Sequence, residues 1–191
     1  MKTSRLEAFS DAVIAIAITI MVLEMKVPHG ADLSVLRPLL PVFTSYLLSF
    51  VYLAIYWNNH HHLLHATERV SGSILWANMH LLFWLSLFPF VTGWLGENRA
   101  DVWPTVMYGV VLLMAAVAYS LLEWAIVRQH SSRSTVARAI GRDAKGAISI
   151  ALYAAAIALA FFAEWAAQAL YVGVALLWLV PDRRIEAALD S

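Results

Sequence analysis

Long apolar segments alternate with short polar ones along the whole chain. Six of the apolar segments approach the length of about 20 residues that an α-helix needs to cross a bilayer. Proline, glycine and charged residues separate them, as Pro28 and Gly30 do after the first. We therefore expect an all-α polytopic membrane protein. It forms a single six-helix transmembrane domain over residues 1–191, with helices at 5–25, 36–61, 71–95, 102–127, 144–163 and 164–180.

One line along the first predicted helix is almost entirely apolar. At about 100° per residue, Phe9, Ile16 and Leu23 fall within about 20° of a common line. Ile20 and Thr19 flank this line on either side. Such a stripe is typical of a packing surface, and in a membrane helix it also suits the lining of a path.

The same helix carries polar residues near its start, in the stretch RLEAFSD. Ser10 and Asp11 point more than about 100° away from the apolar line. Arg5 and Asp11 lie about 120° apart around the helix, so they pair poorly with each other and need partners from another helix or subunit. The two polar residues interrupt the approach to the apolar core, and no small-residue cleavage site follows. We expect the helix to be retained rather than removed as a signal peptide.

Composition agrees with a membrane environment and excludes several functional classes. Hydrophobic residues make up 61% of the chain and charged residues 14%, against about 45–50% and 25% in soluble domains. The formal net charge is zero, which leaves no electrostatic footprint for a nucleic-acid partner. The chain contains no cysteine, so a thiolate nucleophile, a disulfide and a cysteine metal site are all excluded.

The basic residues predict the orientation of the chain. With the N-terminus on the cytoplasmic side, the opposite side holds only Lys26, Arg37 and Arg99. The positive-inside rule then places both termini in the cytoplasm, and the basic loop between the fourth and fifth helices is read as a topology signal rather than a lipid site. The basic residues on the cytoplasmic side are Lys2, Arg5, Arg69, Arg128, Arg133, Arg138, Arg142, Lys145, Arg183 and Arg184.

Three motifs together resemble a known family. RLEAFSDAVIAIAITIMVLEM fits R-x-x-x-F-S-D at the start of a transmembrane helix, YWNNHH ends the second helix, and LFPFVTGWLG follows Asn78 in the third. These motifs resemble the bacterial branch of the FSD-motif six-helix potassium channels, relatives of the animal endolysosomal potassium channel. The resemblance implies a homotetramer in the bacterial inner membrane, surrounded by lipid, with the first helix lining a central pore that potassium ions permeate.

The resemblance also implies roles for individual residues. An aliphatic residue five positions after the motif aspartate forms the narrowest pore ring in that family, which implies Ile16 here. Further rings are implied at Thr19, Ile20 and Leu23. The motif residues would form a polar network that holds the first helix against its neighbours; they are Arg5, Phe9, Ser10 and Asp11.

An aliphatic constriction predicts moderate rather than strong selectivity. The sequence contains no Thr-Val-Gly-Tyr-Gly filter, so a cage of backbone carbonyls is not available. A ring of isoleucines would be too narrow for a fully hydrated ion, and potassium sheds its water more readily than sodium. The Thr19 hydroxyls could replace part of the lost hydration.

Candidate partners for the motif lie where the second helix ends and the third begins. The predicted topology places this region at the same membrane face as the start of the first helix. The side chains there that can donate or accept hydrogen bonds are Trp57, His60, His61 and Asn78. The sequence does not assign the individual pairs.

Two other functions compete with a channel. A proton-coupled secondary transporter would use Asp11 or Glu164, but the chain lacks internal repeats and helices interrupted at mid-membrane. A histidine-box oxidoreductase would use His61 and His65, spaced i, i+4, but the remaining histidines are scattered. We expect no enzyme activity, no metal site and no cofactor.

Overall fold

The computed structural model describes residues 3–65, 67, 69–129 and 143–179, and within them all regular secondary structure is helical. The predicted all-α fold with six helical segments is confirmed, the third segment being divided in two. The elements are α1 Thr3–Leu23, η1 Leu33–Leu39, α2 Leu40–His65, α3 Gly72–Ser86, α4 Phe88–Glu97, α5 Val102–Val127, α7 Ala144–Ala160 and α8 Glu164–Leu179.

Four segments are long and apolar enough to cross a membrane by length and composition: Thr3–Leu23, Leu33–His65, Gly72–Glu97 and Val102–Val127. The helices α7 and α8 are shorter, at 17 and 16 residues. At about 1.5 Å per residue, each spans roughly 25 Å, slightly less than the apolar thickness of a bilayer.

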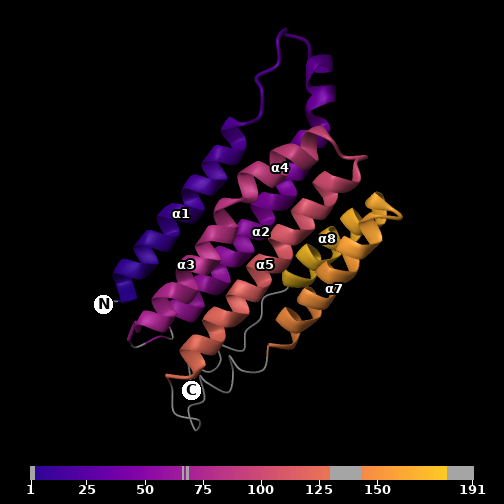
Figure 1. Cartoon of the computed structure of the whole chain (residues 1–191). Helices are drawn as coiled ribbons and strands as arrows, with labels where there is room; N and C mark the ends of the chain where they lie inside the picture. The colour runs from indigo at the N-terminus through magenta and orange to yellow at the C-terminus, as the bar shows by residue number, and fades with distance from the viewer. Residues whose placement is uncertain (1–2, 66, 68, 130–142, 180–191) are drawn as a thin grey trace.

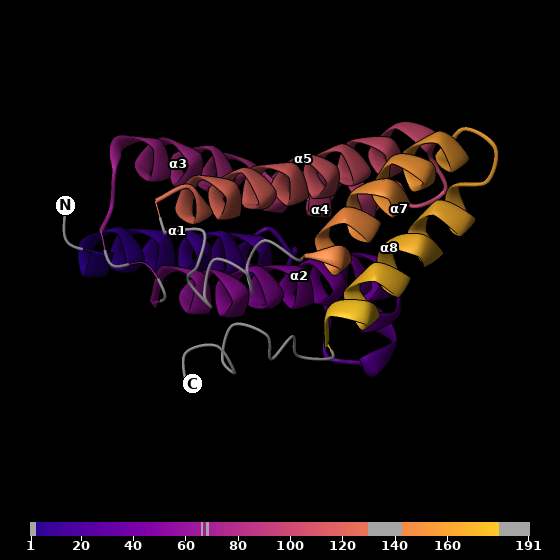
Figure 2. The same cartoon turned by 90° about the horizontal axis from the view of Figure 1, so that it is seen from below.

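The helices run up and down in one bundle, with α1 at one edge and the α7–α8 pair at the other (Figure 1). The central helix is α5, which packs against α3, α4, α7 and α8, whereas α1 packs against α2, α3 and α4. The view from below shows the same separation of α1 from α7 and α8 (Figure 2). One long face of α1 is therefore left uncovered by its own chain.

Prolines account for the two largest departures from the predicted helix boundaries. The second helix was predicted to begin at residue 36, but residues Leu33–Leu39 form a 3-10 helix that contains Pro38, and α2 begins at Leu40. The third was predicted as one helix over 71–95, but it breaks at Leu87, because Pro89 has no amide hydrogen to continue the helical bonding. Pro89 instead occupies the first turn of α4, where that hydrogen is not needed. The expectation that no helix is interrupted along its span is therefore wrong for this segment.

The other boundaries differ by a few residues, and part of the predicted topology cannot be compared. The first helix spans Thr3–Leu23 rather than 5–25, and α7 ends at Ala160 rather than 163. The loop predicted between the fourth and fifth helices lies largely outside the described residues, as do Lys2, Arg183, Arg184 and the last residue of the sixth predicted helix.

A tyrosine-rich core joins α5 to α2 and α8. The Tyr171 hydroxyl donates to the Thr105 carbonyl at 3.1 Å, and Tyr52 donates to the Tyr171 carbonyl at 2.5 Å. Gly109 makes this approach possible, because a β-carbon at that position would overlap the Tyr171 hydroxyl. The side of the bundle opposite to α1 is thus closely packed around α5.

Candidate functional site: the two faces of α1

The buried face of α1 repeats at intervals of three or four residues, the period of a packed helix. Its members face α2, α3 and α4 and are almost fully enclosed. They are Leu6, Ser10, Ile14, Ala17 and Met21. This face attaches α1 to the rest of its own chain.

The opposite face of α1 is exposed in the single chain although it is strongly apolar. Ile16 is 57% exposed and Leu23 75% exposed, with Phe9 and Ile20 also on this face. Thr19 lies among them, and its hydroxyl donates to the Ala15 carbonyl at 2.9 Å. The structure therefore brings the four sequence-predicted lining residues, Ile16, Thr19, Ile20 and Leu23, onto one uncovered surface.

A chain of buried hydrogen bonds fixes the attached face of α1 at its N-terminal half. Asn78 of α3 donates through Nδ2 to Ser10 Oγ at 3.0 Å, and Asn78 Oδ1 lies 2.6 Å from His60 Nε2. Since the amide oxygen can only accept, the hydrogen-bond pattern assigns the proton to His60 Nε2. Ser10 donates in turn to the Leu6 carbonyl at 2.8 Å. All three side chains are fully buried, so the chain joins α1, α2 and α3 at one point.

Two further contacts tie α1 to α2 closer to the surface. Trp57 Nε1 donates to Asp11 Oδ1 at 2.9 Å, and His61 Nδ1 lies 2.8 Å from Glu7 Oε1. The partners are spaced i, i+4 on each helix, and the two helices run antiparallel, so the contacts lie one helical turn apart. Glu7 was not among the sequence-predicted residues, although its position one turn before Asp11 was a usable signal.

The remaining two motif residues lie apart from these hydrogen bonds. Phe9 is 51% exposed, and Arg5 is also exposed, near the same line as Ile16. Within the part of the chain that the structure describes, the Arg5 side chain forms no hydrogen bond or ion pair. The predicted role of Arg5 and Phe9 in a polar network that holds the first helix against its neighbours thus stays a prediction.

The histidines on α2 have separate environments. His60 is buried against Asn78, His61 faces Glu7, and the ring of His65 stacks on that of His61 with centroids 6.1 Å apart. In the described ranges, no group of three or more histidine, aspartate or glutamate side chains is placed to hold a metal ion. The two carboxylates of the transporter alternative lie apart: Asp11 is near the middle of α1, and Glu164 begins α8 at the end of the bundle away from the N-terminus of α1.

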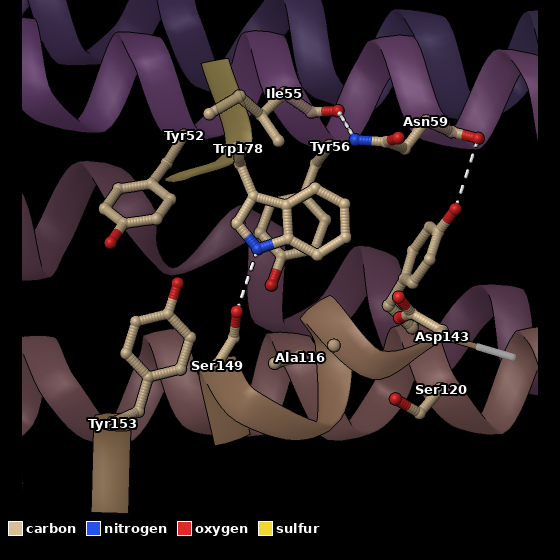
Figure 3. Close-up of a pocket in the computed structure, with 12 residues that line it drawn as sticks. Tyr52, Ile55, Tyr56, Asn59, Ala116, Ser120, Asp143, Ser149, Tyr153 and Trp178 are labelled. Atoms are coloured by element: carbon tan, nitrogen blue, oxygen red, sulfur yellow. Dashed lines mark hydrogen bonds between the residues drawn. The ribbon is translucent and has the colours of Figure 1, made fainter. Parts of the chain in front are cut away.

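A small cavity lies on the other side of the bundle, between α2, α5, α7 and α8 (Figure 3). Its volume is about 30 Å³, enough for a water molecule or two rather than an organic substrate. Trp178 crosses it and donates to Ser149 Oγ at 2.8 Å, and Tyr119 donates to the Asn59 carbonyl at 3.2 Å. No residue of α1 lines this cavity, so it is separate from the exposed stripe.

Comparisons with known proteins found a family model that matches the N-terminal part of the chain and relatives that match most or all of it. A family model described as the endosomal/lysosomal potassium channel TMEM175 matches residues 5–89, which contain most of α1, all of α2 and α3, and the start of α4. The chain is also 51% identical over 191 residues, all of both sequences, to a potassium channel of Chryseobacterium sp. (strain P1-3).

Two comparisons involve Chamaesiphon minutus. A potassium channel of strain ATCC 27169 / PCC 6605 is 34% identical over 179 residues, which cover 86% of this chain and 87% of that one. The crystal structure of a lysosomal potassium-selective channel TMEM175 homolog from Chamaesiphon minutus aligns with a TM-score of 0.70 and 29% identity. That alignment covers 93% of this chain and 96% of the other.

Proposed function

The chain belongs to the TMEM175 family of potassium channels, and on that premise we propose that it forms a homotetrameric, moderately potassium-selective channel lined by α1. The resemblance drawn from the RLEAFSD, YWNNHH and LFPFVTGWLG motifs is confirmed. The named relatives are channels, a class distinct from enzymes, and they do not favour the alternative of a proton-coupled transporter.

The observation that carries the proposal is the contrast between the two faces of α1. One face is held by the buried Ser10–Asn78–His60 chain, while the other presents Ile16 and Leu23 uncovered. Lipid alone could cover such a face. In a family of ion channels, however, a helix that is attached to its own chain on one face and exposes an apolar opposite face is suited to line an ion path on a symmetry axis.

The chemistry follows from the side chains on that stripe. Four Ile16 side chains around an axis would form an apolar collar, at which an ion must lose part of its hydration. Potassium is larger than sodium and holds water less tightly, so the collar opposes sodium more. The Thr19 hydroxyl uses its hydrogen within α1, which leaves its oxygen lone pairs available to a cation.

We place the N-terminus of α1 on the cytoplasmic side of a bacterial inner membrane. The basic-residue asymmetry supports this orientation. The α2–α3 connection and the start of α7 lie at the same end of the bundle as the N-terminus of α1 (Figure 1). Ions would therefore enter from outside past Leu23 and leave past Arg5.

The proposal is tested with purified protein in planar bilayers under potassium and sodium gradients. We expect unitary currents whose reversal potential shifts toward that of potassium. Ile16→Asn should raise the current and reduce discrimination against sodium, because an amide wets the collar. Ile148→Asn is the matched control, since Ile148 is 50% exposed on α7. Equal effects of the two changes, or the absence of wild-type current, would refute the assignment.

A further inference from the structure

The side-chain hydrogen bonds that attach α1 to the rest of its chain are concentrated in its first three turns. Thr3 Oγ1 donates to the Thr67 carbonyl at 3.2 Å. The contacts of Glu7, Ser10 and Asp11 with α2 and α3 follow in the next two turns. The inner part of α1, from Thr3 to Asp11, is therefore held by directional bonds as well as by packing.

The outer part of α1, from Ala12 to Leu23, is held differently. Among the described residues, its side chains make one polar contact with another helix, between Met21 Sδ and Thr92 Oγ1 at 3.6 Å. The Thr92 hydroxyl has a single hydrogen, and Ser49 Oγ lies closer to it, at 2.7 Å. Because an oxygen accepts a hydrogen bond more strongly than a thioether does, this hydrogen goes to Ser49. The outer part of α1 is thus held by packing alone.

The chain that follows α1 adds only a weak attachment. Lys26 Nζ lies 3.0 Å from Oε1 of Glu97 at the end of α4, and the two side chains are 83% and 57% exposed. Exposed ion pairs contribute little to stability, since water and salt screen them. The remainder of the connection to η1 is mostly exposed and rises above the bundle (Figure 1). The outer end of α1 therefore lacks a firm attachment.

From this difference we infer that α1 acts as a lever, whose outer part swings about the inner attachments and changes the width of the path. The inference rests on the proposed function, in which four copies of α1 surround the path. Along the helix, Ile16 lies about 9 Å from Ser10 and Leu23 about 20 Å. A swing about Ser10 thus moves Leu23 about twice as far as Ile16. A small movement at Ile16 is sufficient for gating, because an apolar constriction conducts only when it is wide enough to hold water.

Spin labels on single cysteines test the motion itself. The chain has no cysteine of its own, so a label at Leu23→Cys reports on the outer part of α1 and a label at Ala8→Cys on the inner part. Both positions are exposed. We expect the distances between subunits, measured by pulsed electron paramagnetic resonance, to be spread more widely at Leu23 than at Ala8. Equal widths of the two distance distributions would overturn the inference.

A covalent bridge tests whether this motion controls the current. In the double variant Lys26→Cys, Glu97→Cys, a bifunctional methanethiosulfonate replaces the exposed ion pair with a link between the outer end of α1 and α4. We expect the transitions between open and closed channels to be lost while the bridge is in place and to return when a reductant removes it. The two single-cysteine variants are the matched controls, because the same reagent cannot form the bridge in them.

Three results of the bridging experiment would overturn the inference. They are transitions that continue unchanged in the bridged channel, an equal loss of transitions in the single-cysteine variants, and a wild-type channel that conducts without ever closing. In each case, a wild-type current that responds to Ile16→Asn would still support the proposed function. Absence of any wild-type current would instead refute the proposed function.

Discussion

Trp57 donates its indole hydrogen to Asp11 Oδ1 at 2.9 Å, so the acidic residue of the motif is bound by a side chain of the same subunit. The indole of Trp57 is itself 46% exposed, and the contact lies at the edge of the α1–α2 interface. It is therefore an attachment at the surface, whereas Ser10 and Asn78 lie in the interior.

Removing this bond should loosen α1 only moderately. Trp57→Phe keeps the aromatic surface but removes the donor, and we expect a loss of about 1 kcal/mol in the free energy of unfolding. Trp76→Phe is the matched control, because Trp76 is 75% exposed on α3. Thermal unfolding in detergent compares the two. Identical unfolding of both variants would show that the Asp11 contact contributes nothing.

The buried Asn78 should matter considerably more than Trp57. Asn78→Ala would leave the buried His60 Nε2 without an acceptor, and it would remove the donor to Ser10 Oγ, which keeps its bond to the Leu6 carbonyl. An unsatisfied buried polar group costs about 1–3 kcal/mol and a lost hydrogen bond about 1 kcal/mol, so we expect about 2–4 kcal/mol of destabilisation.

A double-mutant cycle isolates the Ser10–Asn78 bond. Ser10→Ala and Asn78→Ala should together destabilise the protein by less than the sum of the single changes, with a coupling of about 0.5–3 kcal/mol. Strict additivity in denaturant unfolding would show that the two side chains do not interact energetically.

Much of the fold could be predicted from the sequence because it follows from apolar length. The helix predicted over 102–127 is observed at Val102–Val127, since charged or polar residues bound it on both sides. The break at Leu87 was missed because apolar residues continue across it, so length alone gives no sign of a stop. Pro89 was the local signal, since its ring removes the hydrogen bond that would carry the helix onward.

The sequence could predict which polar residues lie near one another, from their positions at helix ends and on helical faces, but not which of them form hydrogen bonds. Topology placed Trp57, His60, His61 and Asn78 near the motif, but pairing depends on the rotation of each helix about its axis. The hydroxyl cluster of Ser49, Thr92 and Tyr108 was not predicted at all. Its two hydrogen bonds, of 2.7 and 2.9 Å, join α2, α4 and α5. The residue pattern within one helix does not show which side chains of two other helices will contact it.

Assembly should involve four chains. The uncovered apolar stripe of α1 needs a partner surface, and an assembly around a symmetry axis provides the same partner surface for every chain. Native mass spectrometry or crosslinking in detergent should give a tetramer. A stable monomer that still conducts potassium would contradict this expectation.

Cysteine accessibility gives the most direct test of which face of α1 lines the path. Cysteines at Thr19 or Leu23 should react with a small methanethiosulfonate and block the current, because both residues lie on the exposed stripe. Cysteines at Ile14 and Ala17 are the controls, since these positions are only 1% and 3% exposed and face the chain's own α2, α3 and α4.

Ala17 and Thr19 are two residues apart on one helix, about 3 Å in depth, so membrane depth alone cannot explain a difference between these two positions. If cysteines at Thr19 and Leu23 react, this face of α1 lines a water-filled path rather than contacting lipid. A thiol in contact with lipid stays protonated and unreactive. If the positions of Ile14 and Ala17 were instead the reactive ones, the stripe would be a packing surface. The ions would then have to follow another helix.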